Sequence, residues 1–158
     1  MKYVIFTALF FISNNLSALN FQCYFEEVYS DGNIQNGFMM IQKDKLRYEY
    51  SDEKLFTLLF VNDKLFYIDN LNRKKVQQIE EKNNLIKDIV KIYSDFPNIK
   101  KSYANNGKIF KIEMSDEKFI KRLAIKSNSL NVSIYFLNCQ TNKLNQKYFN
   151  FNPFFEYE

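Results

Sequence analysis

The stretch FTLLFVNDKLFYID, residues 56–69, contains two short apolar runs separated by Asn62, Asp63 and Lys64. Turn-forming residues between two β-prone runs predict a hairpin. Short runs of the same kind precede and follow this stretch, each bounded by polar turn residues, at 21–28, 37–42, 46–50 and 75–79. Consecutive short strands joined by short turns predict an antiparallel meander.

The spacing of apolar residues changes between Asn83 and Phe96, where they recur every three or four positions. This spacing predicts an amphipathic helix, which Asn83 or Asn84 can cap and which Pro97 ends. Strand patterns then resume, weakly at 102–103 and clearly at 109–114, 119–126, 132–137 and 148–152. One helix cannot cover both faces of so many strands. The sequence therefore predicts a mainly β fold with some α, an incomplete antiparallel β-barrel (half-barrel) covered by a lid helix.

The first residues predict export. Lys2 precedes an apolar run over residues 3–12, and a polar segment ends at Ala18. This layout is typical of a cleavable secretory signal, and the run is too short to span a bilayer as a helix. We expect a signal peptide at 1–18 and a single domain at 19–158. An N-terminal helix retained on the domain is the alternative.

The two cysteines, Cys23 and Cys139, leave two states open. In an oxidising compartment they could form a disulfide, and otherwise they would be two buried thiols. The net charge of +4 comes from basic residues scattered among acidic ones. Because no basic stripe is present, this charge does not indicate nucleic-acid binding.

The residues for common catalytic chemistry are missing. The chain contains no His, and its three glycines do not form a phosphate-binding loop. Adjacent carboxylates occur at Glu26–Glu27, Glu80–Glu81 and Asp116–Glu117. Neighbouring residues on a strand point to opposite faces, so we expect these pairs to be solvated surface groups. The sequence predicts no enzyme, no cofactor and no metal site.

Aromatic residues are abundant, with 17 Phe and 11 Tyr. Several strands are apolar on both faces, such as the one that has Phe56, Leu58 and Phe60 on one side and Leu59 and Val61 on the other. A small sheet needs one apolar face for its core. Either the helix and the termini cover the second face, or the aromatics line an internal cavity for acyl chains that the helix closes.

Four segments together resemble one protein family. They are GFMMIQKDKLRYEY at 37–50, LFVNDKLFYID at 59–69, the closing YFNFNP at 148–153 and the opening ALNFQCYFEE at 18–27. In order and in pattern they resemble the periplasmic outer-membrane lipoprotein carrier family (LolA type). The likeness extends over nearly all of residues 19–153, and Asp44 stands where that family usually has proline.

The resemblance implies a monomeric periplasmic carrier. Its cavity would take acyl chains of lipoproteins from an inner-membrane lipoprotein-releasing transporter and pass them to an outer-membrane receptor. The family's functional basic residue falls on Lys43, and its lid helix falls on 83–96. The cavity-facing candidates on that helix are Leu85, Ile86, Ile89 and Val90. A lipid-sensing or structural envelope protein with the same fold, and a secreted enzyme that uses carboxylates, remain alternatives.

Overall fold

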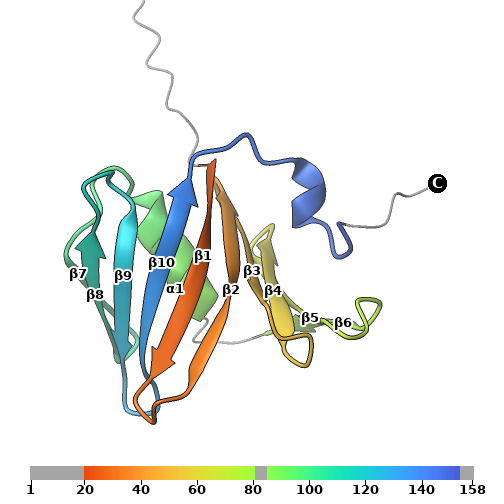
Figure 1. The fold of residues 1–158 in the computed structure, drawn as a ribbon, viewed down its shortest axis with the longest axis horizontal. Coiled ribbons are helices and arrows are strands. Elements are labelled where there is room, and N and C mark those ends of the chain that lie inside the picture. The colour runs from red at the N-terminus through yellow and green to blue at the C-terminus, as the bar shows by residue number, and fades with distance from the viewer. Residues whose placement is uncertain (1–19, 81–84, 154–158) are drawn as a thin grey trace, which may run out of the picture.

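A computed structural model describes residues 20–80 and 85–153 of the chain. One antiparallel sheet contains ten strands in the order β6-β5-β4-β3-β2-β1-β10-β9-β8-β7 (Figure 1). The strands are β1 (Asn20–Tyr29), β2 (Ile34–Gln42), β3 (Lys45–Tyr50), β4 (Phe56–Val61), β5 (Lys64–Asp69), β6 (Val76–Ile79), β7 (Ser102–Asn105), β8 (Lys108–Met114), β9 (Ile120–Lys126) and β10 (Asn131–Gln140). The helices are α1 (Leu85–Ser94) and the short 3₁₀ helix η1 (Gln146–Phe149).

The sheet consists of two meanders that meet in its middle. Strands β1 to β6 pair in chain order, and so do β7 to β10, while β1 pairs with β10 to join the two groups. Among the described strands, β6 and β7 are the two edges and do not pair with each other. The prediction of a mainly β fold with consecutive antiparallel strands and one α-helix is thus confirmed, and the sheet is open rather than closed into a barrel.

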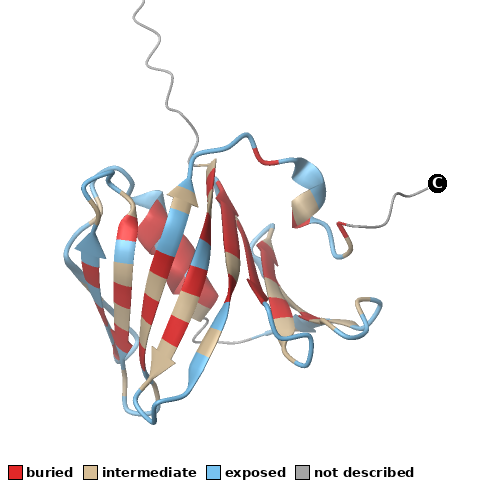
Figure 2. Cartoon of the chain, viewed as in Figure 1, coloured by how far each residue is buried: buried red, intermediate tan, exposed pale blue. Residues whose placement is uncertain are grey.

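The sheet has two faces with different coverings. On the helix face, Phe21, Phe25 and Tyr48 belong to a large buried cluster that also contains the apolar side of α1. On the outer face, a smaller cluster around Leu59 is covered by Phe149 of η1. Figure 2 shows buried positions alternating with less buried ones along β1 and β10. This alternation follows from the two-residue period of a strand.

Helix α1 ends at Ser94, before the predicted end at Phe96. It spans Leu85–Ser94, and the predicted caps at Asn83 and Asn84 lie outside the described residues. The Nζ atom of Lys108 lies 2.6 Å from a carboxylate oxygen of Asp88, and this ion pair ties the helix to β8. The amide of Asn105 donates a hydrogen bond of 2.6 Å to the other oxygen of Asp88.

The strand predicted at 148–152 is wrong. Residues 146–149 form η1, whose start is capped because the Asn145 side chain accepts a hydrogen bond from the backbone N–H of Lys147. Arg47 on β3 donates hydrogen bonds of 3.2 Å to the backbone carbonyls of Tyr148 and Asn150. The segment therefore satisfies its polar backbone through a buried side chain and not through strand pairing.

A disulfide joins Cys23 on β1 to Cys139 on β10. The bond links the two strands at which the meanders meet, and it closes a loop of 116 residues. In the chain-entropy model a loop of this length stabilises the fold by up to about 4.7 kcal/mol. The predicted signal peptide at 1–18 lies outside the described residues. Of the helices that the structure describes, neither is long and apolar enough to cross a membrane.

Candidate functional site: an apolar cavity with a buried carboxylate

A cavity of about 230 Å³ lies between α1 and the helix face of the sheet. Its wall is mostly aliphatic and aromatic, and its polar groups are those of Glu27 and three tyrosines. The lining residues are Glu27, Tyr48, Tyr50, Phe56, Leu58, Leu65, Tyr67, Ile79, Leu85, Ile86, Ile89 and Ile134. A mostly apolar pocket with a few converging polar groups is the usual form of a small-molecule site.

The carboxylate of Glu27 accepts hydrogen bonds from three phenol hydroxyls. Tyr48 donates to one oxygen at 2.7 Å, while Tyr50 and Tyr29 donate to the other at 3.0 and 2.6 Å. Glu27 is only 5% exposed. A carboxylate offers about four acceptor positions, so three donors leave room for one more.

The position of Glu27 follows from the period of β1. Phe21, Cys23 and Phe25 all face the helix side and are buried, and Glu27 is the next residue on the same face. Of the three tyrosines that donate to it, Tyr29 is two residues further along β1, whereas Tyr48 and Tyr50 come from β3, so their approach depends on how the strands are ordered and not on the local sequence of β1.

Gly37 makes room for the rings beside Glu27. In the sheet Gly37 pairs with Phe25 on one side and with Tyr50 on the other. A Cβ atom at position 37 would lie 2.6 Å from the Cζ atom of Phe25 and would also clash with the carbonyl oxygen of Glu49. Without it, the Phe25 ring crosses β2 and stacks on Tyr48, with 3.9 Å between the ring centroids.

A row of aromatic rings leads from the carboxylate along the cavity wall. Tyr50 contacts Phe56 edge to face at 5.0 Å between centroids, and Phe56 contacts Tyr67 at 4.9 Å. Such pairs add about 0.5–1.5 kcal/mol beyond the area that they bury. Because the rings hold one another, the wall of the cavity is ordered before any ligand arrives.

The tyrosines stay protonated at neutral pH. Burial raises the pKa of Tyr48 and Tyr50 well above 10, and the negative charge of Glu27 raises it further. Burial and the hydrogen bond to Glu27 raise the pKa of Tyr29 in the same direction. All three groups are therefore hydrogen-bond donors to the carboxylate that they surround.

Most of the predicted site residues lie around this cavity. Phe56, Leu58, Leu85, Ile86 and Ile89 line it. Phe60 and Val90 are buried in the same helix-face cluster but are not part of the cavity wall.

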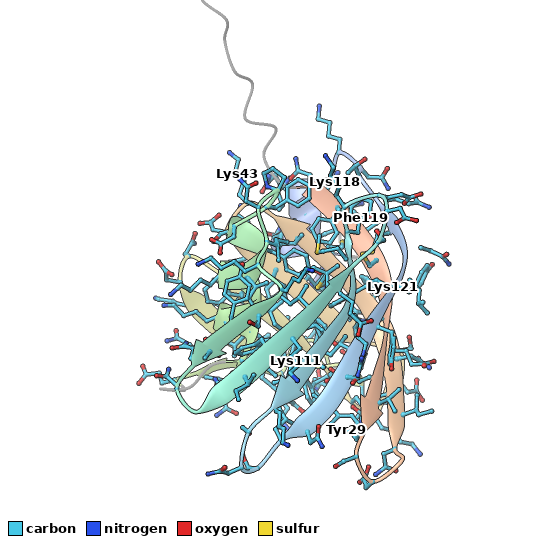
Figure 3. The ribbon with its side chains drawn as sticks, turned by 90° about the vertical axis from the view of Figure 1, so that its left-hand side faces the viewer. Tyr29, Lys43, Lys111, Lys118, Phe119 and Lys121 are labelled. Carbon is cyan, nitrogen blue, oxygen red and sulfur yellow. A yellow bond between two sulfur atoms is a disulfide. The ribbon has the colours of Figure 1, made fainter. Side chains whose placement is uncertain are left out.

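Lys43 lies elsewhere. It occupies the β2–β3 turn with a φ of 55° and an exposed side chain. Figure 3 shows Lys43 at the opposite end of the molecule from Tyr29, which contacts Glu27. The structure does not bring Lys43 together with the other predicted residues.

Sequence reasoning missed Glu27. The expectation that paired carboxylates are solvated is wrong for this residue, whereas Glu80, Asp116 and Glu117 are exposed. Glu26 points to the outer face and is half-buried, as the alternation along a strand requires. The available signal was that Glu27 continues the apolar series at 21, 23 and 25, which places a carboxylate on a core-facing row.

Among the residues that the structure describes, no cluster of three His, Cys, Asp or Glu side chains could hold a metal ion. Comparison with known proteins finds no family model and no curated protein that matches this chain.

Proposed function

We propose that this protein is a periplasmic carrier that binds the acyl chains of lipoproteins and ferries them from the inner to the outer membrane. The observation that carries this proposal is the apolar cavity between α1 and the sheet. In this proposal the curved sheet is a half-barrel and α1 is its lid. The disulfide supports an oxidising compartment, which agrees with residues 1–18 acting as a signal peptide.

Loading requires the lid to move. The cavity of about 230 Å³ is smaller than the 300–1,000 Å³ of typical ligand pockets, so a long acyl chain does not fit while α1 is closed. Ile86 and Ile89 of α1 form part of the wall and are buried. An acyl chain that displaces them would replace their apolar contacts, at roughly 0.8 kcal/mol for each buried CH₂.

The ion pair between Asp88 and Lys108 gives the lid a fixed attachment. It ties α1 to β8, on the far side of the sheet from β4 and β5, which supply Phe56, Leu58 and Tyr67 to the wall. In our proposal α1 swings about this attachment and opens the side that faces β4 to β6. Hand-over to an outer-membrane receptor would use the same opening after release from the inner-membrane transporter.

The test narrows the cavity by replacing a half-buried residue of its wall and not a fully buried core residue. Leu58 is half-buried and lines the cavity, whereas Val61 is half-buried on the outer face of the same strand. Leu58→Trp should lower the affinity for a diacylated lipopeptide at least tenfold, and Val61→Trp should leave it within about twofold. Native mass spectrometry of the protein purified without detergent would report the bound mass.

The alternative is a lipid-sensing or structural envelope protein with the same half-barrel. It predicts that the wild-type protein carries no acyl mass after incubation with the lipopeptide. That result would overturn the carrier proposal.

A further inference from the structure

We propose that the cavity selects a cationic amphiphile, with Glu27 as the counter-ion of an ammonium group and the apolar wall around its chain. This inference rests on the proposed function, because it names the head group of the ligand that the cavity would hold. Its basis is the charge of Glu27, the aromatic rings next to it, and the aliphatic side chains beyond them.

Three buried carboxylates lie among the described residues, and two of them have cationic partners. Glu49 lies 2.7 Å from nitrogens of two arginines, and Asp88 lies 2.6 Å from the nitrogen of Lys108. Within residues 20–80 and 85–153, Glu27 forms no ion pair, and its hydrogen-bond partners are neutral hydroxyls. A buried charge without a counter-charge is costly, and a bound cation would relieve that cost.

The rings provide the second part of the argument. Tyr50, Phe56 and Tyr67 line the cavity in an unbroken row that begins at the carboxylate. Aromatic faces attract ammonium groups, and walls built from several rings recognise methylated ammonium groups in particular. Beyond the rings the wall is aliphatic, with Leu65, Ile79 and Leu85 available to an alkyl chain. The cavity thus has a place for each half of a cationic amphiphile.

The alternative head groups fit less well. A carboxylate or sulfate head would meet the negative charge of Glu27 at close range and would be repelled. A neutral head group would leave that charge unpaired. The open side of the Glu27 carboxylate suits a positive charge, and the neighbouring rings suit the methyl groups of a methylated ammonium.

The experiment compares three probes of equal chain length by isothermal titration calorimetry, each below the concentration at which it forms micelles. The probes are decyltrimethylammonium, decanoate and 1-decanol. Wild-type protein should bind the ammonium probe at least tenfold more tightly than the other two. Glu27→Gln should reduce this preference to about twofold or less. The matched control, Glu26→Gln on the outer face of the same strand, should keep it.

A second variant tests the rings without changing the carboxylate. Tyr67 is half-buried at the cavity wall, so Tyr67→Leu should retain the fold. It should weaken binding of the ammonium probe at least threefold and leave decanol binding within twofold. Far-UV circular dichroism and thermal melts confirm that each variant is folded.

The outcomes separate this inference from the carrier proposal. Equal affinities for the three probes would overturn the cationic selection while an apolar binding function stands. A preference that persists in Glu27→Gln would also overturn it. No binding of any probe, together with no binding of the lipopeptide, would overturn both proposals.

Discussion

Both faces of the sheet bury charged side chains, but the partners of those charges differ between the two faces. On the outer face, Arg47 is only 1% exposed and lies between Glu49 and the carbonyls of Tyr148 and Asn150. Arg73 adds a second ion pair of 2.7 Å to Glu49. On the helix face, Glu27 is equally buried, but it contacts neutral hydroxyls and borders a cavity.

This difference distinguishes the outer-face charges, which stabilise the fold, from the helix-face carboxylate, which is a candidate for binding. On the outer face Arg47 and Glu49 neutralise one another, and a remaining nitrogen of Arg47 holds the segment that contains η1 against β3. The helix-face carboxylate has spare acceptor capacity next to open space. Buried charges that are fully paired stabilise a particular packing, whereas a buried charge with open space beside it is a candidate for ligand contact.

The largest expected effect comes from breaking the outer-face network. Glu49→Gln leaves Arg47 buried without a carboxylate partner, because Glu49 is the residue that pairs with both arginines. Removing one partner of a buried ion pair typically costs 3–5 kcal/mol. We expect a loss of about 3 kcal/mol in the free energy of unfolding, measured by urea titration with far-UV circular dichroism because the chain has no Trp.

The corresponding substitution on the helix face should have a much smaller effect on stability. Glu27→Gln removes a charge that has no cation partner among the described residues, and the amide oxygen can still accept from the tyrosine hydroxyls. We expect a loss of about 1 kcal/mol or less, in the range of a single hydrogen bond. A larger loss than for Glu49→Gln would contradict the distinction between the two faces.

Gly37→Ala should have an intermediate effect, because it disturbs the rings of the helix face. The added methyl group would meet both the backbone carbonyl oxygen of Glu49 and the Phe25 ring, so β3 would have to shift and the ring would move away from Tyr48. Overpacking of this kind typically costs 1–3 kcal/mol, and we expect about 2 kcal/mol. Near-UV circular dichroism of the tyrosines should lose intensity as well. The neighbouring Asn36→Ala serves as control, and an equal loss there would show that the ring contact is not the cause.

The two faces should also lose stability at opposite ends of the pH scale. Burial acts to raise the pKa of Glu49, but the hydrogen bond from Arg73 and the charge of Arg47 outweigh it and lower the pKa. Its contribution is therefore present above the usual pKa of 4.5 and is lost as the pH falls through the lower folded value. Tyr48 and Tyr50 have raised pKa values, so unfolded tyrosines ionise first and stability declines above about pH 10.

The midpoints of urea unfolding, measured between pH 2.5 and 11, test both the acid and the alkaline loss of stability. Glu49→Gln should reduce the loss of stability at acid pH. Tyr48→Phe should reduce the loss of stability at alkaline pH only in part, because other buried tyrosines also contribute to it. Each substitution should change the pH dependence at one end of the range only. A smaller alkaline loss of stability in Glu49→Gln would show that the two faces are not independent.

The sequence was informative where structure follows from local period. Alternation placed Phe56, Leu58 and Phe60 on one face, and the helical spacing placed Ile86 and Ile89 toward the sheet. The sequence did not predict features that depend on contacts between segments far apart in the chain. The burial of Glu27 depends on hydroxyls from β3. The alternating aromatic residues at 148–151 resemble a strand, but in the structure this segment accepts hydrogen bonds from Arg47 through its carbonyls. Such contacts span about 20 to 100 residues and leave no local pattern.

The smallest expected effect is at Lys43, the residue chosen from the family resemblance. It lies at the β2–β3 turn, at the other end of the molecule from Tyr29, and its exposed side chain forms no contact with the cavity wall among the described residues (Figure 3). Lys43→Gly should change the affinity for decyltrimethylammonium by less than twofold, and it should stabilise the fold by up to about 1 kcal/mol because the φ of 55° suits glycine. Calorimetry and urea titration measure the two quantities. A large loss of affinity would mean that binding extends from the cavity to this turn. The protein would then have a second site of ligand contact, which the buried carboxylate does not explain.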